Sequence, residues 1–194
     1  PQGSVRMGQT DVSALRPGGR RRLGLHFVPE ERLGRGAVPT LSLAHNLLLT
    51  RTNAVSGSGW IQVGALQKHA QSIIERFHVK AGGPNSAAKS LSGGNLQKFI
   101  VGREIDANPT LLIVSQPTWG VDVGAAAQIR GEILALRDAG CAVLVVSEEL
   151  DELFEISDRL HVIAKGRLSP SLPNKRLTSA NSVIDVGHTS GHWV

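Results

Sequence analysis

The sequence Leu91-Ser92-Gly93-Gly94-Asn95-Leu96-Gln97-Lys98 decides the fold of this chain. A serine followed by two glycines and a helical pattern predicts a helix N-terminus, with Ser92 as its N-cap and an unobstructed backbone. Apolar residues repeat at helical spacing behind this turn, and Asn108-Pro109 ends the run. Such a terminus presents unpaired amide donors and the positive end of a helix dipole, which together favour a phosphate. Taken alone, the same pattern also fits an ordinary capped helix after a glycine-rich turn.

Two apolar runs follow this helix, and their order predicts a parallel sheet. In Leu111–Val114 every residue is apolar, without the alternation of apolar and polar residues found in half-exposed strands, and this predicts a strand covered on both faces. Ala142–Val146 shows the same pattern after a predicted helix at residues 125–137. Strand, helix and strand in this order predict a right-handed crossover between parallel strands. The first run leads into Ser115-Gln116-Pro117-Thr118-Trp119-Gly120-Val121-Asp122, and the second leads into Ser147-Glu148.

In this order and spacing, the motifs resemble the ATP-binding subunits of ABC transporters over residues 20–170. The form Leu-Ser-Gly-Gly-Asn-Leu-Gln-Lys is similar to the second half of the tandem ATPases of simple-sugar and nucleoside importers. The resemblance implies an α/β fold, with a P-loop NTPase-like parallel core sheet and an ABC-type helical subdomain. The phosphate loop Gly-x-x-x-x-Gly-Lys-Ser/Thr has no match in residues 1–194. We therefore expect an N-terminally truncated C-terminal half, without its first strands, that binds ATP weakly or not at all.

The resemblance divides the chain into four predicted parts. They are a core remnant at residues 1–39, a helical subdomain ending in the signature helix at 40–108, a parallel-sheet core at 109–169, and a C-terminal arm at 170–194 that is expected to be partly disordered. In the first part, Leu23–Val28 predicts a strand and Gly18-Gly19 a turn. In the second part, residues 63–79 predict an amphipathic helix with five apolar side chains on one face: Leu66, Ala70, Ile73, Ile74 and Phe77.

The predicted nucleotide-facing residues are Ser92, Gly93, Gly94 and Asn95, together with Asp122. In the resembled family these elements act in trans, on ATP that is held by the phosphate loop of the other half. The resemblance therefore implies ATP and Mg²⁺ as cofactors, both bound through the full-length dimeric ATPase. We expect this half to supply the turn at Ser92–Asn95 to a competent site on its partner.

The chain's own nucleotide site is predicted to be degenerate at Ser115, Gln116 and Glu148. The family pattern places Asp-Glu after the first apolar run, where Asp holds the magnesium shell and Glu orients or deprotonates the attacking water. Ser115 carries no charge to balance Mg²⁺, and Gln116 cannot accept a proton from water. Glu148 stands where the family often has a histidine that contacts the γ-phosphate. We expect no intact catalytic residue and no metal ligand in this half.

A charged loop, Glu30-Glu31-Arg32, follows the first predicted strand. In the resembled family, the loop facing the membrane subunit begins here, often with a glutamine that touches the metal and the attacking water. Glu30 stands at that position in this chain. A surface charge cluster is the alternative interpretation of the same residues, and the sequence leaves both open.

The resemblance also implies partners and a location. The expected partners are an N-terminal ATPase half or a second ATPase subunit, transmembrane permease subunits and, indirectly, a substrate-binding protein. The expected location is the cytoplasm, peripheral to the inner face of the cell membrane. Whether the cargo is a sugar or a nucleoside stays open, although Ser115-Gln116 followed by Trp119–Asp122 resembles the purine and nucleoside branch.

The composition bears on two alternative functions but excludes neither of them. The net charge of +5 permits a non-transport ABC ATPase acting on nucleic acid or translation, and a non-catalytic regulatory half is a further alternative. Few aromatic residues are available to stack bases, which argues against nucleic acid. One cysteine, Cys141, opens an apolar strand and is predicted to be a buried small hydrophobe. His188 and His192 lie in a Gly/Ser context and are not expected to bind a metal.

Overall fold

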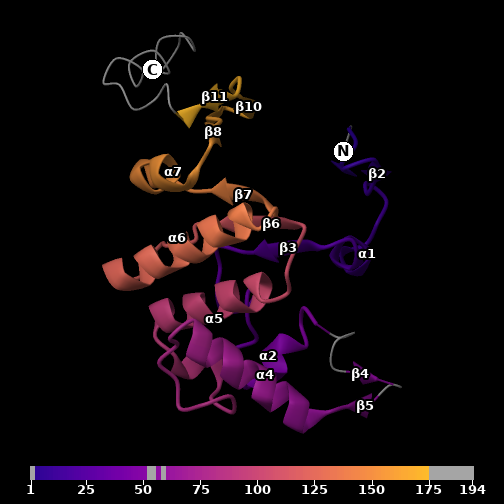
Figure 1. Cartoon of the computed structure of the whole chain (residues 1–194), viewed down its shortest axis with the longest axis vertical. Coiled ribbons are helices and arrows are strands. Elements are labelled where there is room, and N and C mark those ends of the chain that lie inside the picture. The colour runs from indigo at the N-terminus through magenta and orange to yellow at the C-terminus, as the bar shows by residue number, and fades with distance from the viewer. Residues whose placement is uncertain (1–2, 52–55, 58–59, 175–194) are drawn as a thin grey trace. The chain divides into compact units, whose positions relative to one another are not determined.

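A computed structural model gives the structure of residues 3–51, 56–57 and 60–174. The chain divides into two compact units, Pro1–Val146 and Ser147–Val194, and Figure 1 shows the elements of each. From residue 175 onward, the predicted C-terminal arm lies outside the described residues, together with His188 and His192.

The first unit is built on a parallel sheet with the strand order β3-β6-β7 (Figure 1). Its strands are β3 (Leu25–Val28), β6 (Leu111–Ser115) and β7 (Ala142–Val146). The central strand β6 pairs in parallel with both neighbours, which confirms the predicted parallel core. Because parallel strands end at the same edge of a sheet, the segments after β3 and β6 start close together. This edge carries Glu30 and Ser115 of the predicted site residues.

Strand β7 differs from its prediction as a buried strand. Leu144 and Val146 are about half exposed, at 53% and 49%. The physical reason is the face of the sheet on which they lie. In the register they lie beside Ile113 and Ser115 of β6, which are half-buried, whereas Leu112 and Val114 on the opposite face are completely buried. An apolar run therefore identified the strand correctly but not its degree of burial.

The helical part of the first unit comprises α2 (Leu43–Leu47), α4 (Val63–Arg76) and α5 (Gly93–Ile105). Helix α4 packs against α2 and α5. All five apolar side chains predicted to share one face of this helix are buried. The segments between these helices contain the strand pair β4 (Ser56–Gly57) and β5 (Trp60–Ile61), and a short 3₁₀ helix at Ala88–Ser90.

Helix α5 is the central element of the first unit. It contacts β3, α4 and α6 (Val123–Asp138), and α6 in turn contacts β7. Every residue of α5 from Phe99 to Ile105 is buried, including two charged ones. The predicted helix and its end before Asn108-Pro109 are confirmed. Since its far end is enclosed by other elements, α5 holds its N-terminal turn at a fixed place relative to the sheet.

The N-terminal lead forms a strand pair, β1 (Arg6–Met7) and β2 (Thr10–Asp11), and then the helix α1 (Pro17–Arg22). The prediction of a turn at Gly18-Gly19 is therefore wrong. Pro17 occupies the first helical position, where its fixed φ suits a helix and its missing N–H costs nothing. Three arginines fill the last turn, where positive charge complements the helix dipole. These two local effects outweigh the low helix propensity of the glycines.

The second unit consists of α7 (Leu150–Ile156) and two antiparallel strand pairs. The pairs join β9 (Ile163–Ala164) to β10 (Arg167–Leu168), and β8 (Arg159–Leu160) to β11 (Leu172–Pro173). Lys165 and Gly166, with φ values of 47° and 74°, form the two-residue turn between β9 and β10.

Candidate functional site

The N-terminal turn of α5 is open to solvent. Ser92 and Gly93 are exposed, and Ser92 is the N-cap residue, with an extended backbone. Its side chain makes no capping hydrogen bond to the helix, and instead Ser92 Oγ accepts from Asn95 Nδ2 at 2.9 Å. The first turn of a helix has amides without intrahelical partners, so this turn presents donors to the outside. We call residues 92–95 the signature turn.

Asp122 lies beside the signature turn. It is the N-cap of α6, and its Oδ1 accepts a hydrogen bond from the backbone N–H of Ala125 at 2.8 Å. This hydrogen bond lowers the pKa of Asp122, which keeps the carboxylate ionised. A Cβ built on Gly94 would lie 3.7 Å from Val121 Cβ and 3.8 Å from Asp122 Oδ2. The fold therefore brings together the five residues that were predicted to face a nucleotide.

Arg32 turns inward from its loop, toward the same place. Its Nε donates to Gln97 Oε1 at 3.1 Å, and its Nη2 donates to the carbonyl oxygen of Trp119. The guanidinium also lies over the Trp119 ring, with its Cζ 5.8 Å from the ring centroid. Burial lowers the pKa of Arg32, although an arginine side chain stays charged in proteins. Arg32 thus connects its loop to both α5 and the segment after β6.

The rest of this loop is folded back on itself. The N–H of Ala37 donates to the carbonyl oxygen of Arg32 at 2.7 Å, and Arg35 pairs with Glu31 at 2.9 Å on the surface. Glu30 and Glu31 are both exposed. Of the three residues predicted to face a partner, the two glutamates therefore lie at the surface while the arginine does not.

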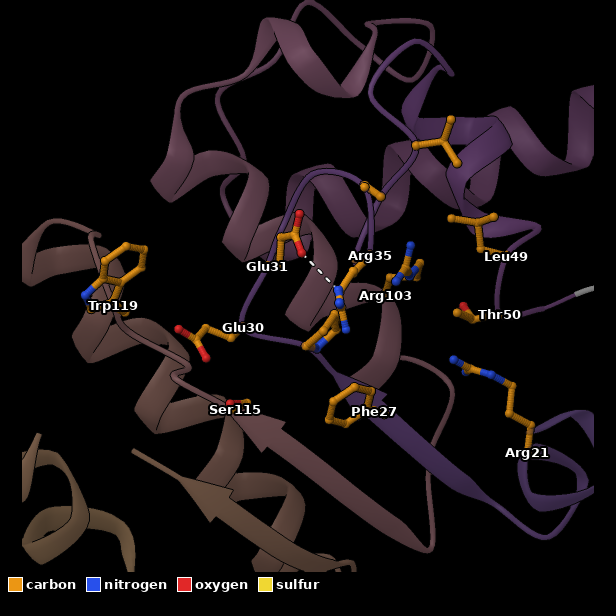
Figure 2. Close-up of a pocket in the computed structure, with 15 residues that line it drawn as sticks. Arg21, Phe27, Glu30, Glu31, Arg35, Leu49, Thr50, Arg103, Ser115 and Trp119 are labelled. Carbon is orange, nitrogen blue, oxygen red and sulfur yellow. Dashed lines mark ion pairs between the residues drawn. The ribbon is translucent and has the colours of Figure 1, made fainter. Parts of the chain in front are cut away.

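A pocket of about 880 Å³ opens at the edge of the sheet where β3 and β6 end (Figure 2). Glu30 and Glu31 line it from the loop after β3, and Ser115 lines it from the last position of β6. Phe27 and Trp119 add apolar surface to this wall. Glu30 and Ser115, predicted from separate motifs, therefore share one pocket.

The other two positions of the predicted degenerate site behave differently. Gln116 is buried at 9% exposure and has φ of 50°, a left-handed backbone that is uncommon for a residue with a side chain. Its N–H donates to the carbonyl oxygen of Val146 at 2.7 Å, which continues the β6–β7 pairing. Glu148 is exposed and belongs to the second unit.

The residues at the end of β6 do not suit a resident magnesium ion. Ser115 and Gln116 are both neutral, whereas Mg²⁺ in proteins is usually bound through one or two carboxylates. Within residues 3–51, 56–57 and 60–174, no group of three or more His, Cys, Asp or Glu side chains could hold a metal. A chemical step through a metal at Ser115 has no support in this chain.

The cysteine, Cys141, is buried, as predicted, and burial raises the pKa of its thiol.

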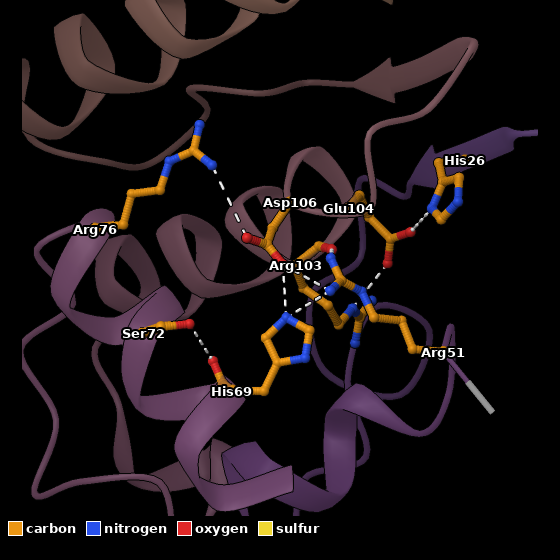
Figure 3. Close-up of polar contacts among 8 residues, drawn as sticks. All are labelled: His26, Arg51, His69, Ser72, Arg76, Arg103, Glu104 and Asp106. Carbon is orange, nitrogen blue, oxygen red and sulfur yellow. Dashed lines mark hydrogen bonds and ion pairs between the residues drawn. The ribbon is translucent and has the colours of Figure 1, made fainter. Parts of the chain in front are cut away.

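Arg103, which also lines the pocket, belongs to a buried ionic cluster with His26 and Glu104 (Figure 3), and the half-buried Arg21 joins this cluster from α1. Glu104 is its centre and accepts from His26 Nδ1 at 2.7 Å, from Arg21 Nη1 at 3.0 Å and from Arg103 Nε at 2.8 Å. Burial alone would raise the pKa of this carboxyl. The hydrogen bond from His26 and the two arginine charges outweigh it and lower the pKa to about 2. The cluster ties β3 and α1 to the last turn of α5.

A second ionic group joins the end of α5 to the other helices (Figure 3). Asp106 Oδ2 accepts from Arg51 Nη1 at 2.6 Å and from His69 Nε2 at 2.7 Å. Burial would raise the pKa of Asp106, but these two partners lower it overall. Arg51 also donates to the carbonyl oxygen of Arg103 at 2.6 Å, so the two clusters meet on α5. The C-terminal end of α5 is therefore fixed by charge pairs.

Sequence reasoning missed the inward turn of Arg32 and the role of Gln97. The side chain of Gln97 is 1% exposed, accepts from Arg32, and donates from Nε2 to the carbonyl oxygen of Pro117 at 3.0 Å. A polar residue next to Leu96 on the buried side of a helix needs polar partners. This requirement indicates that Gln97 has a polar partner, but it does not say which distant residue supplies that partner.

No family model matches the chain. It is similar to curated proteins, among them the nucleoside import ATP-binding protein NupA of Lactococcus lactis, which is 42% identical over 86% of this chain. The guanosine import ATP-binding protein NupO of Bacillus subtilis is 37% identical over 91%, and the xylose import ATP-binding protein XylG of Burkholderia ambifaria is 38% identical over 90%. The chain spans about a third of the length of these relatives, 33–35%.

The fold is similar to that of solved ATP-binding cassettes. A dimeric bacterial ABC transporter cassette has a TM-score of 0.74 at 18% identity, with coverage of 89% of this chain and 74% of that one. A dimeric ATP-binding cassette in a post-hydrolysis state, bound to ADP and Pi, has a TM-score of 0.72 at 20% identity and the same coverages.

The fold and the signature turn are those of an ATP-binding cassette, so the chain belongs to the ABC ATPase family. Within this family, its homologues are the ATP-binding proteins of sugar and nucleoside importers, as the motifs indicated.

Across the part of the chain that the structure describes, no helix combines the length and the apolar character required to cross a bilayer.

Proposed function

We propose that this chain is the C-terminal nucleotide-binding half of an ABC importer ATPase, and that it presents its signature turn in trans to ATP held by a partner half. The observation that carries this proposal is the turn at residues 92–95, which is exposed at Ser92 and Gly93 and has Asp122 beside it, in a chain whose homologues are import ATP-binding proteins. Exposed amides at a helix N-terminus favour a phosphate that another polypeptide segment delivers.

In the full-length subunit, the site of this half binds nucleotide without turning it over in this proposal. Ser115 and Gln116 are neutral where the chemistry requires a metal-balancing charge and a proton acceptor. Glu148 adds a negative charge where the family often contacts the γ-phosphate. The work is therefore divided, so that the partner half holds ATP and this half completes the partner's site.

The partners in this proposal are a second ATPase half, transmembrane permease subunits and a substrate-binding protein. In this proposal the loop with the exposed Glu30 and Glu31 faces the permease, and the protein acts at the inner face of the membrane. The cargo is a sugar or a nucleoside. Two of the relatives described above are named for nucleoside and guanosine import, which favours a nucleoside.

Changing Gly93 to Asp tests the proposed function in the full-length subunit assembled with its membrane subunits. The new carboxylate would repel the phosphate that the turn is proposed to meet, and we expect ATP turnover to fall by about 100-fold or more. The matched control is Gly131→Asp on α6, because Gly131 is exposed and nothing lies within 4 Å of an added Cβ. Unchanged turnover in Gly93→Asp would refute the proposal.

Gln116→Glu tests whether this half's own site is degenerate. The change supplies a proton acceptor but leaves Ser115 and Glu148 in place, so we expect no gain in hydrolysis. The measurement is ATP turnover in full-length protein whose partner site has been inactivated, with and without the change. A large increase in rate would show that a single residue silences this site.

A further inference from the structure

Arg32 contacts three different parts of the first unit, which are its own loop, helix α5 and the segment after β6. Its own backbone belongs to the loop after β3, where its carbonyl oxygen accepts from Ala37. Its side chain donates to Gln97 on α5 and to the carbonyl oxygen of Trp119 in the segment after β6. The planar fork of a guanidinium has donors pointing in several fixed directions, which suits such separate acceptors. A lysine in the same place has a single donor group.

The contact with Gln97 makes the connection continuous. Gln97 accepts from Arg32 at 3.1 Å and donates to the carbonyl oxygen of Pro117 at 3.0 Å. Arg32 and Gln97 therefore hold the segment after β6 at two points, Pro117 and Trp119. Since Gln97 is buried, loss of the arginine leaves its amide oxygen without this partner, which is unfavourable for a buried polar atom. This segment leads directly to Asp122.

The guanidinium also lies against the signature turn itself. A Cβ added to Gly93 would be 2.6 Å from Arg32 Nη1, and one added to Gly120 would be 3.5 Å from Arg32 Nη2. Any side chain at position 93 would therefore collide with the arginine as it is placed here. The two glycines leave the space in which the guanidinium sits, between the signature turn and the segment after β6.

We propose that Arg32 is a positioning residue for ATP hydrolysis, which holds the signature turn and the segment carrying Asp122 in one arrangement and couples both to the loop after β3. This inference rests on the proposed function, because it concerns the same trans-acting turn. It assigns Arg32 a role inside the cassette rather than on the surface that faces the permease. Movement of the loop would then reach the nucleotide-facing turn through this side chain.

The test compares Arg32→Met, Arg32→Lys and Gly93→Asp in the full-length transporter. We expect Arg32→Met to lower kcat by about tenfold or more, because a displacement of about 1 Å in a positioning group can cost about 100-fold. The KM for ATP should stay within about twofold, since the phosphate loop that holds ATP belongs to the partner half. Arg32→Lys keeps the charge and one donor group, so it should recover part of the lost rate.

Arg137→Met is the matched control, because Arg137 pairs with its neighbour Asp138 on the surface of α6, remote in sequence from the signature turn. It should leave kcat and KM at wild-type values, as expected for a surface pair. An Arg32→Met enzyme with wild-type kcat overturns the inference if Gly93→Asp is inactive in the same assay. A higher KM with unchanged kcat also overturns it. Full turnover in Gly93→Asp instead refutes the proposed function.

Trp119 provides a second readout, which reports directly on the contact between the Arg32 side chain and the segment after β6. In a background where Trp60 and Trp193 are replaced by phenylalanine, Trp119 is the only tryptophan of the 194-residue chain. Arg32→Met removes the cation over its ring, so we expect its emission to shift and its quenching by acrylamide to increase in the folded state. An emission spectrum and quenching that match those of Arg137→Met in the same background would overturn the inference.

Discussion

Replacing Glu104 by alanine is expected to destabilise the chain by about 3–5 kcal/mol, because it leaves buried cations without their counter-ion. Glu104 is completely buried and is the common partner of His26, Arg21 and Arg103. Chemical unfolding of the 194-residue chain, followed by circular dichroism, measures the loss. The matched control is Glu31→Ala, which breaks an exposed pair with Arg35 and should cost about 1 kcal/mol or less. Equal losses in the two variants would contradict the importance of the cluster.

The lowered pKa of Glu104 predicts that the free energy of unfolding depends on pH. The pKa of Glu104 is about 2 in the folded protein, against an ordinary value of 4.5. Its contribution is therefore fully present above pH 4.5 and is lost as the pH falls from 4.5 toward 2. A shift of this size corresponds to about 3 kcal/mol. The difference in unfolding free energy between wild type and Glu104→Gln should shrink over this interval, and a constant difference would contradict the prediction.

Replacing Gly102 by alanine is expected to destabilise the chain by about 2 kcal/mol, although alanine is the better helix former. A Cβ at this position would lie 2.6–2.9 Å from three ring atoms of Phe77, which is 1% exposed. Overpacking of this kind costs up to about 3 kcal/mol, and the gain in helix propensity offsets about 1 kcal/mol of it. Gly102 thus sets how closely α5 approaches α4.

Gly131→Ala on α6 is the matched control for this substitution. Gly131 is exposed, and nothing lies within 4 Å of an added Cβ, so only the propensity gain remains. It should stabilise the chain by about 1 kcal/mol in the same unfolding experiment. A Gly102→Ala protein as stable as Gly131→Ala would show that Phe77 moves aside at little cost.

Local sequence signals account for the main elements of the first unit. The serine and two glycines before an apolar helical repeat predicted where α5 begins, and the five-residue apolar face of α4 is buried as expected. Continuous apolar runs predicted β6 and β7 and the parallel order of the sheet. The same signals failed at Gly18-Gly19, where a proline at the first helical position and charges at the helix end decided the structure.

Part of the candidate site was also accessible from the sequence, because its motifs are short and each occupies one element. Ser92–Asn95 begin α5 and Asp122 caps α6, so their positions follow from helix boundaries. Their proximity follows from the parallel sheet, which brings the ends of its strands to one edge. The inward turn of Arg32 was not accessible, because nothing within its own loop distinguishes it from Arg35, which stays at the surface.

The sequence by itself determined the order of the elements, the parallel sheet and the exposed signature turn, since each depends on neighbouring residues or on helical and strand periodicity. Only the tertiary structure decided that Arg32 reaches Gln97 and Trp119, and that Glu104 gathers His26, Arg21 and Arg103. Residues 32 and 119, or 26 and 104, are far apart along the chain, and no periodic pattern relates them. A buried charge requires a counter-charge, but the folding of distant segments against α5 selects which residue provides it.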